Sequence, residues 1–200
     1  RSVLLEEAVE RLLTRRDGTY VDCTLGAGGH SEAILRRLGD EGRLIGIDQD
    51  EEALRIAEDR LAPYGERVTL VKANFRHLGA VLDRLGVGAV DGFLLDLGIS
   101  SMQVDTLERG FSYHHDHRLD MRMDRRQSLS AWEVVNRWPE SQIRDILFRY
   151  GEERFAPQIA RAIVARRSEG SIDTTGQLAE IVKSAIPAAA RRTGPHPARR

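Results

Sequence analysis

One stretch decides the predicted fold: Thr19-Tyr20-Val21-Asp22-Cys23-Thr24-Leu25-Gly26-Ala27-Gly28-Gly29-His30-Ser31. Residues 19–24 are rich in side chains that favour β-strands, and the glycines run into a helical pattern that extends to residue 38. Small residues let a backbone close on a ligand, and free N–H groups at the start of a helix point toward it. The stretch therefore predicts a strand, a glycine loop and a helix that together bind a nucleotide.

The glycine loop matches the dinucleotide fingerprint G-x-G-x-x-G only in part. Gly26 and Gly28 take the first two positions, but Ser31 stands where the third small residue belongs. Asp48 falls at the end of the next predicted strand, where a carboxylate can accept hydrogen bonds from both hydroxyls of a ribose. These features predict an adenosine-containing cofactor, and they leave open whether it is a nicotinamide or a methyl donor.

The first half of the chain alternates strands with helices. Further buried strands are expected at residues 43–47, 68–71 and 91–96, and helices at residues 4–16, 51–61 and 77–85. Strands that alternate with helices and are apolar on both faces form parallel sheets, so we predict a doubly wound, Rossmann-like α/β domain. Four strands are fewer than such a domain usually has, so we expect the sheet to be incomplete and the chain to be truncated.

Asp96 ends the fourth predicted strand and precedes Leu97-Gly98-Ile99-Ser100-Ser101. Ligands of doubly wound sheets bind beyond the carboxyl ends of the strands, so Asp22, Asp48 and Asp96 should converge on one crevice. A carboxylate there can accept a hydrogen bond from an exocyclic amino group and orient its lone pair toward an electrophilic methyl group. Alternatively, Asp96 caps a loop or the next helix.

The second half of the chain is predicted to be helical after an irregular segment. Residues 97–127 show no sustained hydrophobic period, and long irregular stretches in compact proteins are usually functional or disordered. Helices are expected at residues 129–138, 140–150, 153–167 and 175–186, and a loop or frayed tail at residues 187–200. We therefore divide the chain into an α/β part, residues 1–109, and a helical part, residues 110–200.

Arginines and aromatic residues alternate in the irregular segment between residues 109 and 124. Arginines suit contacts with phosphates, and an aromatic ring beside them suits stacking on an unpaired base. Arg109, Phe111 and Arg122 are therefore hypothetical RNA contacts. An internal ion pair between Arg122 and Asp124 that orders the loop is an equally good interpretation.

Composition narrows the class of protein. Of the 200 residues, 41% are hydrophobic and 30% charged, which suits one globular domain with or without a smaller appendage. No apolar run approaches the roughly 20 residues that cross a bilayer, and the N-terminus lacks the features of a signal peptide, so we expect a cytoplasmic protein. The second half is the more basic, which suits either a phosphate backbone or a solvated surface.

Metal and thiol chemistry are not expected. The single cysteine, Cys23, lies in an apolar stretch and is predicted to be a buried structural thiol. His114, His115 and His117 fit no common zinc spacing, so solvated or hydrogen-bonded histidines are favoured.

Several distinctive strings carry a family resemblance. They are Val3-Leu4-Leu5-Glu6-Glu7, residues 22–31, 42–48 and 91–101, Asn74-Phe75, Gln103, Arg109-Gly110-Phe111-Ser112, Leu119-Asp120-Met121-Arg122-Met123-Asp124, Tyr150-Gly151-Glu152-Glu153-Arg154 and His196-Pro197. Over essentially its whole length the chain resembles the bacterial ribosomal small subunit methyltransferase H family. That family transfers a methyl group from S-adenosylmethionine to the exocyclic N4 of a cytosine in the decoding region of 16S ribosomal RNA.

The resemblance implies a set of site residues and partners. By matching position, it assigns contacts with S-adenosylmethionine to Gly28, Gly29, His30, Asp48, Phe75, Asp96 and Gln103. Asp96 is also the candidate catalytic residue, and the implied partners are 16S ribosomal RNA and the small ribosomal subunit. Without the resemblance, Phe75 would pass as a core aromatic.

The resemblance also has limits. Met102 stands where the family usually has proline, and family members continue past His196-Pro197 to supply the remaining strands. The helical part would then be an insertion in the methyltransferase domain. The alternatives are an amino methyltransferase that acts on DNA or another RNA and a non-catalytic nucleotide-binding or RNA-binding module. The oligomeric state stays open, a homodimer included.

Overall fold

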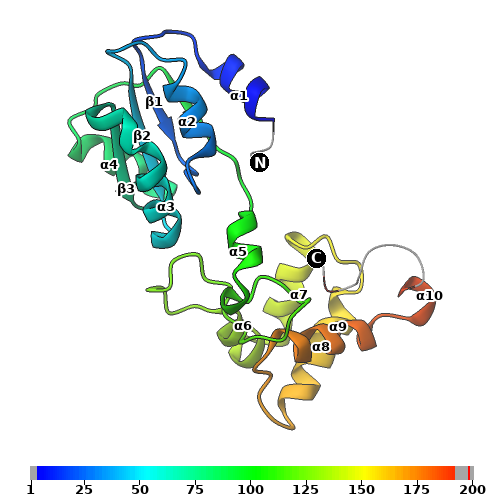
Figure 1. Ribbon diagram of the computed structural model, residues 1–200. Coiled ribbons are helices and arrows are strands. Elements are labelled where there is room, and N and C mark those ends of the chain that lie inside the picture. Colours follow the sequence, from blue (N-terminus) through cyan, green and yellow to red (C-terminus); the bar gives the residue numbers. More distant parts are fainter. Residues whose placement is uncertain (1–3, 192–197, 199–200) are drawn as a thin grey trace. The chain divides into compact units, whose positions relative to one another are not determined.

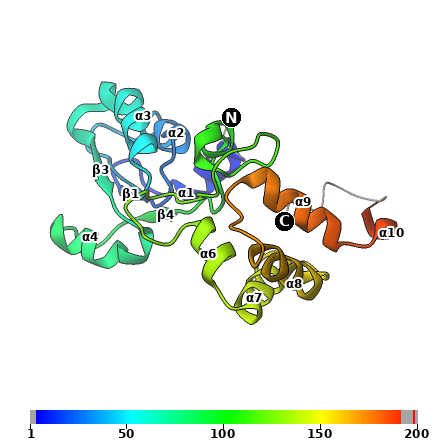
Figure 2. The ribbon, with the colours of Figure 1, turned by 90° about the horizontal axis from the view of Figure 1, so that it is seen from below.

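The chain forms two compact units, Arg1–Gly98 and Ile99–Arg200. The computed structural model describes residues 4–191 and residue 198, so Val3 and the His196-Pro197 motif lie outside the described residues. Figures 1 and 2 show the strands in the first unit and a group of helices in the second. The units divide between Gly98 and Ile99, whereas the sequence-based prediction placed the boundary after Arg109.

The first unit contains a parallel sheet with the strand order β3-β2-β1-β4. Its strands are β1 (Thr19–Asp22), β2 (Arg43–Asp48), β3 (Val68–Lys72) and β4 (Gly92–Leu94). All three neighbouring pairs are parallel, which confirms the predicted doubly wound α/β fold. Strand β4 is shorter than predicted because its ladder ends at Leu94, and the N–H of Asp96 turns to the Thr24 side chain.

Helices cover both faces of this sheet (Figure 1). They are α1 (Leu5–Leu12), α2 (Gly29–Leu35), α3 (Glu51–Leu61) and α4 (Leu78–Arg84), with short 3-10 turns η1 (Ala62–Arg67) and η2 (Phe75–His77). Tyr20 and Leu44 pack with apolar residues of α1–α3 on one face, whereas Val21 and Ile45 pack with Val81 of α4 on the other. Alternate strand residues therefore build two separate cores, as a doubly wound sheet requires.

Cys23 belongs to the core on the α4 face. Its side chain is buried, as predicted, and burial raises the pKa of the thiol to about 11. A thiol with such a pKa is protonated at neutral pH, so Cys23 is a structural residue.

The outer edge of β4 has no further strand within the part of the chain that the structure describes. Phe93 in β4 exposes 48% of its surface, and Leu95 just beyond it exposes 49%. Phe93 and Leu95 therefore leave apolar surface exposed at this short edge strand. The expectation that the sheet is incomplete in this chain stays a prediction.

The second unit is helical. Its larger helices are α6 (Ala131–Arg137), α7 (Glu140–Arg149), α8 (Ala156–Arg167) and α9 (Thr175–Ala185), which confirms the four predicted helices with shorter ends. They pack around a core that includes Leu119, Ile143, Ile159 and Ile163, and Figures 1 and 2 both show α7 beside α8. Among residues 4–191 and 198, no helix is both long and apolar enough to span a bilayer.

Two predictions for the second unit were wrong in part. The segment predicted to be irregular contains α5 (Ser101–Asp105) and the 3-10 turn η3 (Leu107–Arg109), and the predicted tail contains α10 (Ala188–Arg191). The Ser100 side chain accepts from the N–H of Gln103, and the Gln103 side chain accepts from the N–H of Ser100. This capping box specifies a helix too short to show a hydrophobic period.

Candidate nucleotide site of the first unit

The four strands end at one edge of the sheet, where the predicted site residues gather. Within the sheet, β2 and β3 lie on one side of β1, and β4 lies on its other side. The order of the strands therefore reverses at β1. Open parallel sheets bind ligands at the carboxyl ends of the strands beside such a reversal. The glycine loop follows β1, Asp48 ends β2 and Asp96 follows β4, so the structure brings these predicted residues to one edge.

The glycine loop has a backbone that only glycine adopts easily. Gly26 and Gly28 have φ angles of 51° and 78°, in the left-handed region where a side chain adds strain. A Cβ at Gly28 would also lie 3.4 Å from the Ala57 side chain on α3. The N–H of Gly28 donates to the Leu25 carbonyl over 2.9 Å, so a tight turn leads from β1 into Gly29, the first residue of α2.

Asp48 ties the glycine loop to strand β2. Its Oδ2 accepts a hydrogen bond from the N–H of Gly26 over 2.8 Å, and its Oδ1 accepts one from the N–H of Asp50 over 2.9 Å. Burial raises the pKa of the Asp48 carboxyl, and the N–H groups of Asp50 and Gly26 counteract that rise. The N–H of Gln49 also lowers the pKa of this carboxyl, so three backbone N–H groups act on it. A carboxylate has about four acceptor positions, so acceptor capacity remains for ribose hydroxyls. The acceptor oxygens of Asp48 therefore fit an adenosine-containing cofactor.

Asp22 lies beneath the loop and is fully buried. Its Oδ2 accepts from the Ser31 hydroxyl over 2.8 Å, and its Oδ1 accepts from the N–H of Thr24 over 3.1 Å. The Ser31 hydroxyl explains the departure from the dinucleotide fingerprint, because a third glycine would leave this oxygen of Asp22 without that donor. Asp22 was predicted to face the crevice. Its side chain has no exposed surface and instead accepts hydrogen bonds from Thr24 and Ser31 at the two ends of the loop.

Asp96 is the accessible carboxylate of the site. Its side chain is 49% exposed, and its Oδ2 lies 3.9 Å from Nδ1 of His30, whose own side chain is buried. The N–H of Asp96 donates to the Thr24 hydroxyl over 2.7 Å. The predicted residues His30 and Asp96 therefore meet directly, and Thr24, which sequence reasoning did not select, holds the Asp96 backbone.

Phe75 occupies the same edge of the sheet, beyond β3. It is 41% exposed, so it is not the core aromatic that the sequence without its resemblance would suggest. Asn74 fixes the turn before it: its Oδ1 accepts from the N–H of Arg76, and its Nδ2 donates to the Gln49 side chain over 2.8 Å. An exposed ring on a hydrogen-bonded turn is suited to stacking on a planar base.

Gln103 belongs to the second unit. It is buried, and its side-chain oxygen accepts from the N–H of Ser100 over 3.1 Å. The described contacts give this residue a role in capping α5, and its assignment as a cofactor contact stays a prediction.

Two of the three hypothetical RNA contacts are engaged inside the second unit. Arg109 is buried, and its Nη2 donates to the carbonyl groups of Arg122 and Met123, both over 3.0 Å. Arg122 forms a bidentate pair with Asp120 at 2.8 Å and also donates to the backbone. The Arg122 guanidinium holds the pKa of the Asp120 carboxyl below its usual value. Phe111 is half-buried.

The ion pair predicted between Arg122 and Asp124 is replaced by a neighbouring arrangement. Arg122 pairs with Asp120, whereas Asp124 pairs with Arg126 at 2.8 Å. The segment is also anchored to the start of α9, because the N–H of Leu119 donates to the carbonyl of Asp173. In the described part of the chain, no cluster of three or more histidine, cysteine or acidic side chains is arranged to hold a metal ion.

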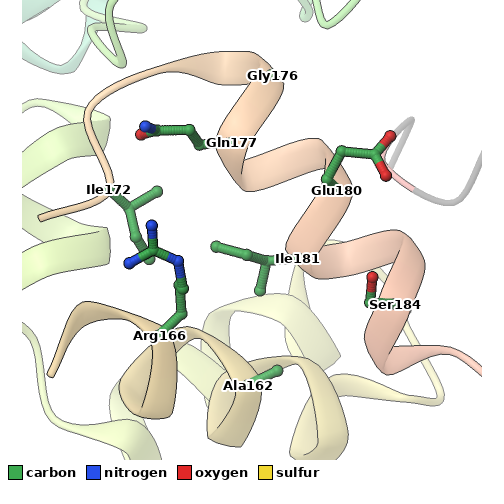
Figure 3. A pocket seen from close by; sticks show the side chains of 8 residues that line it. All are labelled: Ala162, Arg166, Ile172, Gly176, Gln177, Glu180, Ile181 and Ser184. Carbon is green, nitrogen blue, oxygen red and sulfur yellow. The ribbon is translucent and has the colours of Figure 1, made fainter. Parts of the chain in front are cut away.

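A separate groove lies between α8 and α9 in the second unit (Figure 3). Apolar side chains of Ala162, Ile172 and Ile181 line it together with the polar side chains of Arg166, Gln177, Glu180 and Ser184. None of the site residues predicted from the sequence contributes to this lining. The groove and the candidate nucleotide site are therefore built from different elements.

Replacing Asp22 by asparagine should flatten the pH dependence of stability of the first unit. Burial raises the pKa of Asp22, so the folded chain retains a proton that the unfolded chain loses above about pH 4. The free energy of unfolding therefore falls as the pH rises from about pH 4 to the raised pKa of folded Asp22. Above that pKa it no longer changes with the titration of Asp22. Asparagine keeps one acceptor for Thr24 and carries no charge. We expect the Asp22→Asn variant to be the more stable protein at pH 7.

Denaturant unfolding between pH 4 and pH 8, followed by far-ultraviolet circular dichroism, measures this effect. Asp59→Asn, on the exposed surface of α3, is the control and should keep the slope of the unaltered protein. If the free energy of unfolding changes equally with pH in the Asp22→Asn variant and in the unaltered protein, the buried carboxyl does not limit stability.

The fold and the site define a doubly wound α/β protein with a candidate nucleotide site at the carboxyl ends of its strands. Comparison with known proteins narrows this class, because the model of the MraW methylase family matches residues 1–200. The chain belongs to that family.

Curated relatives support the assignment. The chain is 61% identical over 198 residues to "Ribosomal RNA small subunit methyltransferase H" of Symbiobacterium thermophilum, covering 99% of this chain and 62% of that protein. It is 56% identical over 199 residues to the protein of the same name from Brevibacillus brevis, covering 100% of this chain and 63% of that protein. The chain thus spans less than two thirds of the length of these relatives.

Among solved structures, NSun6 from Pyrococcus horikoshii with SFG aligns at a TM-score of 0.41 and 26% identity. The alignment covers 49% of this chain and 24% of that one.

Proposed function

We propose that the protein containing this chain is an S-adenosylmethionine-dependent methyltransferase. Its target would be the exocyclic N4 of a cytosine in the decoding region of 16S ribosomal RNA. The names of the relatives and the family support methyl transfer to the RNA of the small ribosomal subunit. The observation that carries the proposal is the meeting of the glycine loop, Asp48 and the exposed Asp96 at one edge of the sheet. A ribosomal substrate also implies a cytoplasmic location.

Each residue of the site has a proposed part in holding the methyl donor. Asp48 would accept hydrogen bonds from the ribose hydroxyls, Phe75 would stack on the adenine, and Gly28, Gly29 and His30 would line the loop around the rest of the molecule. By the family resemblance alone, Gln103 is proposed as a further contact of the methyl donor. We also propose that the helical part of the chain is an insertion in the methyltransferase domain.

Asp96 is proposed to orient the amine of the cytosine. When bound, S-adenosylmethionine supplies an electrophilic methyl group. The Asp96 carboxylate, half-exposed beside His30, can accept a hydrogen bond from the amino group and keep the nitrogen lone pair directed at that methyl. Its role is to position the nucleophile. The nitrogen–methyl bond would form as the sulfur–methyl bond of the donor breaks, with S-adenosylhomocysteine as the leaving group and one proton of the amino group released to solvent.

Mass mapping of methylated nucleotides tests the proposal. The full-length protein is incubated with S-adenosylmethionine and with small ribosomal subunits, free 16S ribosomal RNA or DNA. We expect N4-methylcytosine in the decoding region and none in the DNA. Methylation of DNA or of another RNA would replace the proposal with a different amino methyltransferase. Cofactor binding without transfer to any substrate would indicate a non-catalytic module.

A further inference from the structure

A chain of hydrogen bonds connects helix α2 with the end of strand β4. It starts at the Ser31 hydroxyl, which donates to Asp22 Oδ2 over 2.8 Å. The other oxygen of this carboxyl, Oδ1, accepts from the N–H of Thr24 over 3.1 Å. The chain of hydrogen bonds ends at the Thr24 hydroxyl, which accepts from the N–H of Asp96 over 2.7 Å. One polar connection therefore joins Ser31 of α2 and Asp22 of β1 to Asp96, which lies just beyond β4.

The middle of this connection is costly for the fold. Asp22 has no exposed surface, and taking a carboxylate out of water disfavours its charged form. An apolar residue of similar size would fill such a place without that cost. Asp22 pairs with Leu94 of β4, two residues before Asp96. The residue that is unfavourable to bury therefore lies close to the candidate site.

Thr24 is the end of the connection that reaches the candidate catalytic carboxylate. The backbone pairing of β1 and β4 ends where the N–H of Cys23 donates to the carbonyl of Leu94. Beyond that point the Thr24 hydroxyl takes over as the acceptor for the N–H of Asp96. The place of the half-exposed Asp96 side chain is thus set by a side-chain contact instead of by the sheet ladder.

We propose that Thr24 is a positioning residue for Asp96, and that Asp22 and Ser31 hold Thr24 in place for this task. The inference rests on the proposed function, which gives Asp96 the orientation of the substrate amine. Methyl transfer depends on the distance and alignment of the reacting atoms, and a displacement of about 1 Å can cost about 100-fold in rate. Loss of the Thr24 hydroxyl should therefore reduce turnover more than it weakens cofactor binding.

The test compares Thr24→Val with Thr24→Ser in the full-length protein. Valine keeps the shape and removes the acceptor, whereas serine keeps the hydroxyl. We expect Thr24→Val to lower kcat by about 10-fold to 100-fold. The Kd for S-adenosylmethionine should stay within about threefold, because Asp48 and the glycine loop are unchanged, and serine should restore kcat to within about threefold. Thr69→Val, an exposed position of β3, is the matched control and should behave as the unaltered protein.

Amide hydrogen exchange at Asp96 gives a readout that does not require activity. Exchange should accelerate in Thr24→Val and remain slow in Thr24→Ser. If the unaltered protein transfers no methyl group, the proposed function fails, but the exchange at Asp96 still decides whether Thr24 holds this residue. If Thr24→Val does not fold, the Ser31→Ala variant should show the same acceleration in a weaker form. Unchanged kcat together with unchanged exchange at Asp96 would overturn the proposal.

Discussion

The Asp48→Ala variant of the full-length protein is expected to bind S-adenosylmethionine at least about 100-fold more weakly than the unaltered protein. Hydrogen bonds to a charged group contribute about 1.5–3 kcal/mol each, and the proposed binding mode uses two of them, to the ribose hydroxyls. The variant also removes the acceptor for the N–H of Gly26, so the glycine loop loses its connection to β2. Isothermal titration calorimetry measures the change in Kd directly.

Two further variants make this measurement specific. Asp48→Asn keeps the shape of the side chain and one acceptor, so its affinity should fall between those of the alanine variant and the unaltered protein. Glu58→Ala removes an exposed carboxylate from α3 and should leave the affinity unchanged. If the Asp48→Ala variant binds as tightly as the unaltered protein, Asp48 does not hold the ribose.

The sheet could be predicted because its physics is local in the sequence. Buried parallel strands appear in the sequence as short apolar runs, and the glycine-rich stretch predicts the first turn between a strand and a helix. The rule that ligands bind at the carboxyl ends of strands also predicts that Asp48 and Asp96 lie at the same end of the sheet. The same rule could not separate Asp22 from them, because the bond from Ser31 that draws Asp22 below the loop depends on how α2 packs.

The second unit was harder to predict, because its features depend on contacts and capping. Helix α5 has five residues and is specified by the reciprocal bonds of Ser100 and Gln103, not by a hydrophobic period. Phe75 and Arg109 show the corresponding problem for single side chains. An aromatic residue and an arginine carry no local signal of burial, and the structure exposes the first and buries the second.

Replacing Arg109 by methionine is expected to destabilise the second unit by about 3 kcal/mol. Methionine keeps most of the side-chain volume but donates no hydrogen bond. The carbonyl groups of Arg122 and Met123 would lose their donor, and each unsatisfied buried polar group costs about 1–3 kcal/mol. Arg125→Met, at an exposed position of the same segment, should change the free energy of unfolding by less than about 0.5 kcal/mol.

Tryptophan fluorescence follows the unfolding of the second unit alone, because both tryptophans of the chain, Trp132 and Trp138, lie in it. Denaturant titrations of the Arg109→Met variant should therefore show an earlier midpoint with this probe. The hypothesis that Arg109 binds RNA predicts the opposite pattern, in which the midpoint is unchanged and RNA binding weakens. Because the guanidinium is buried and donates to two backbone carbonyls, we expect the loss of stability. Any loss of RNA binding would then follow from loss of order in residues 109–124 of the variant.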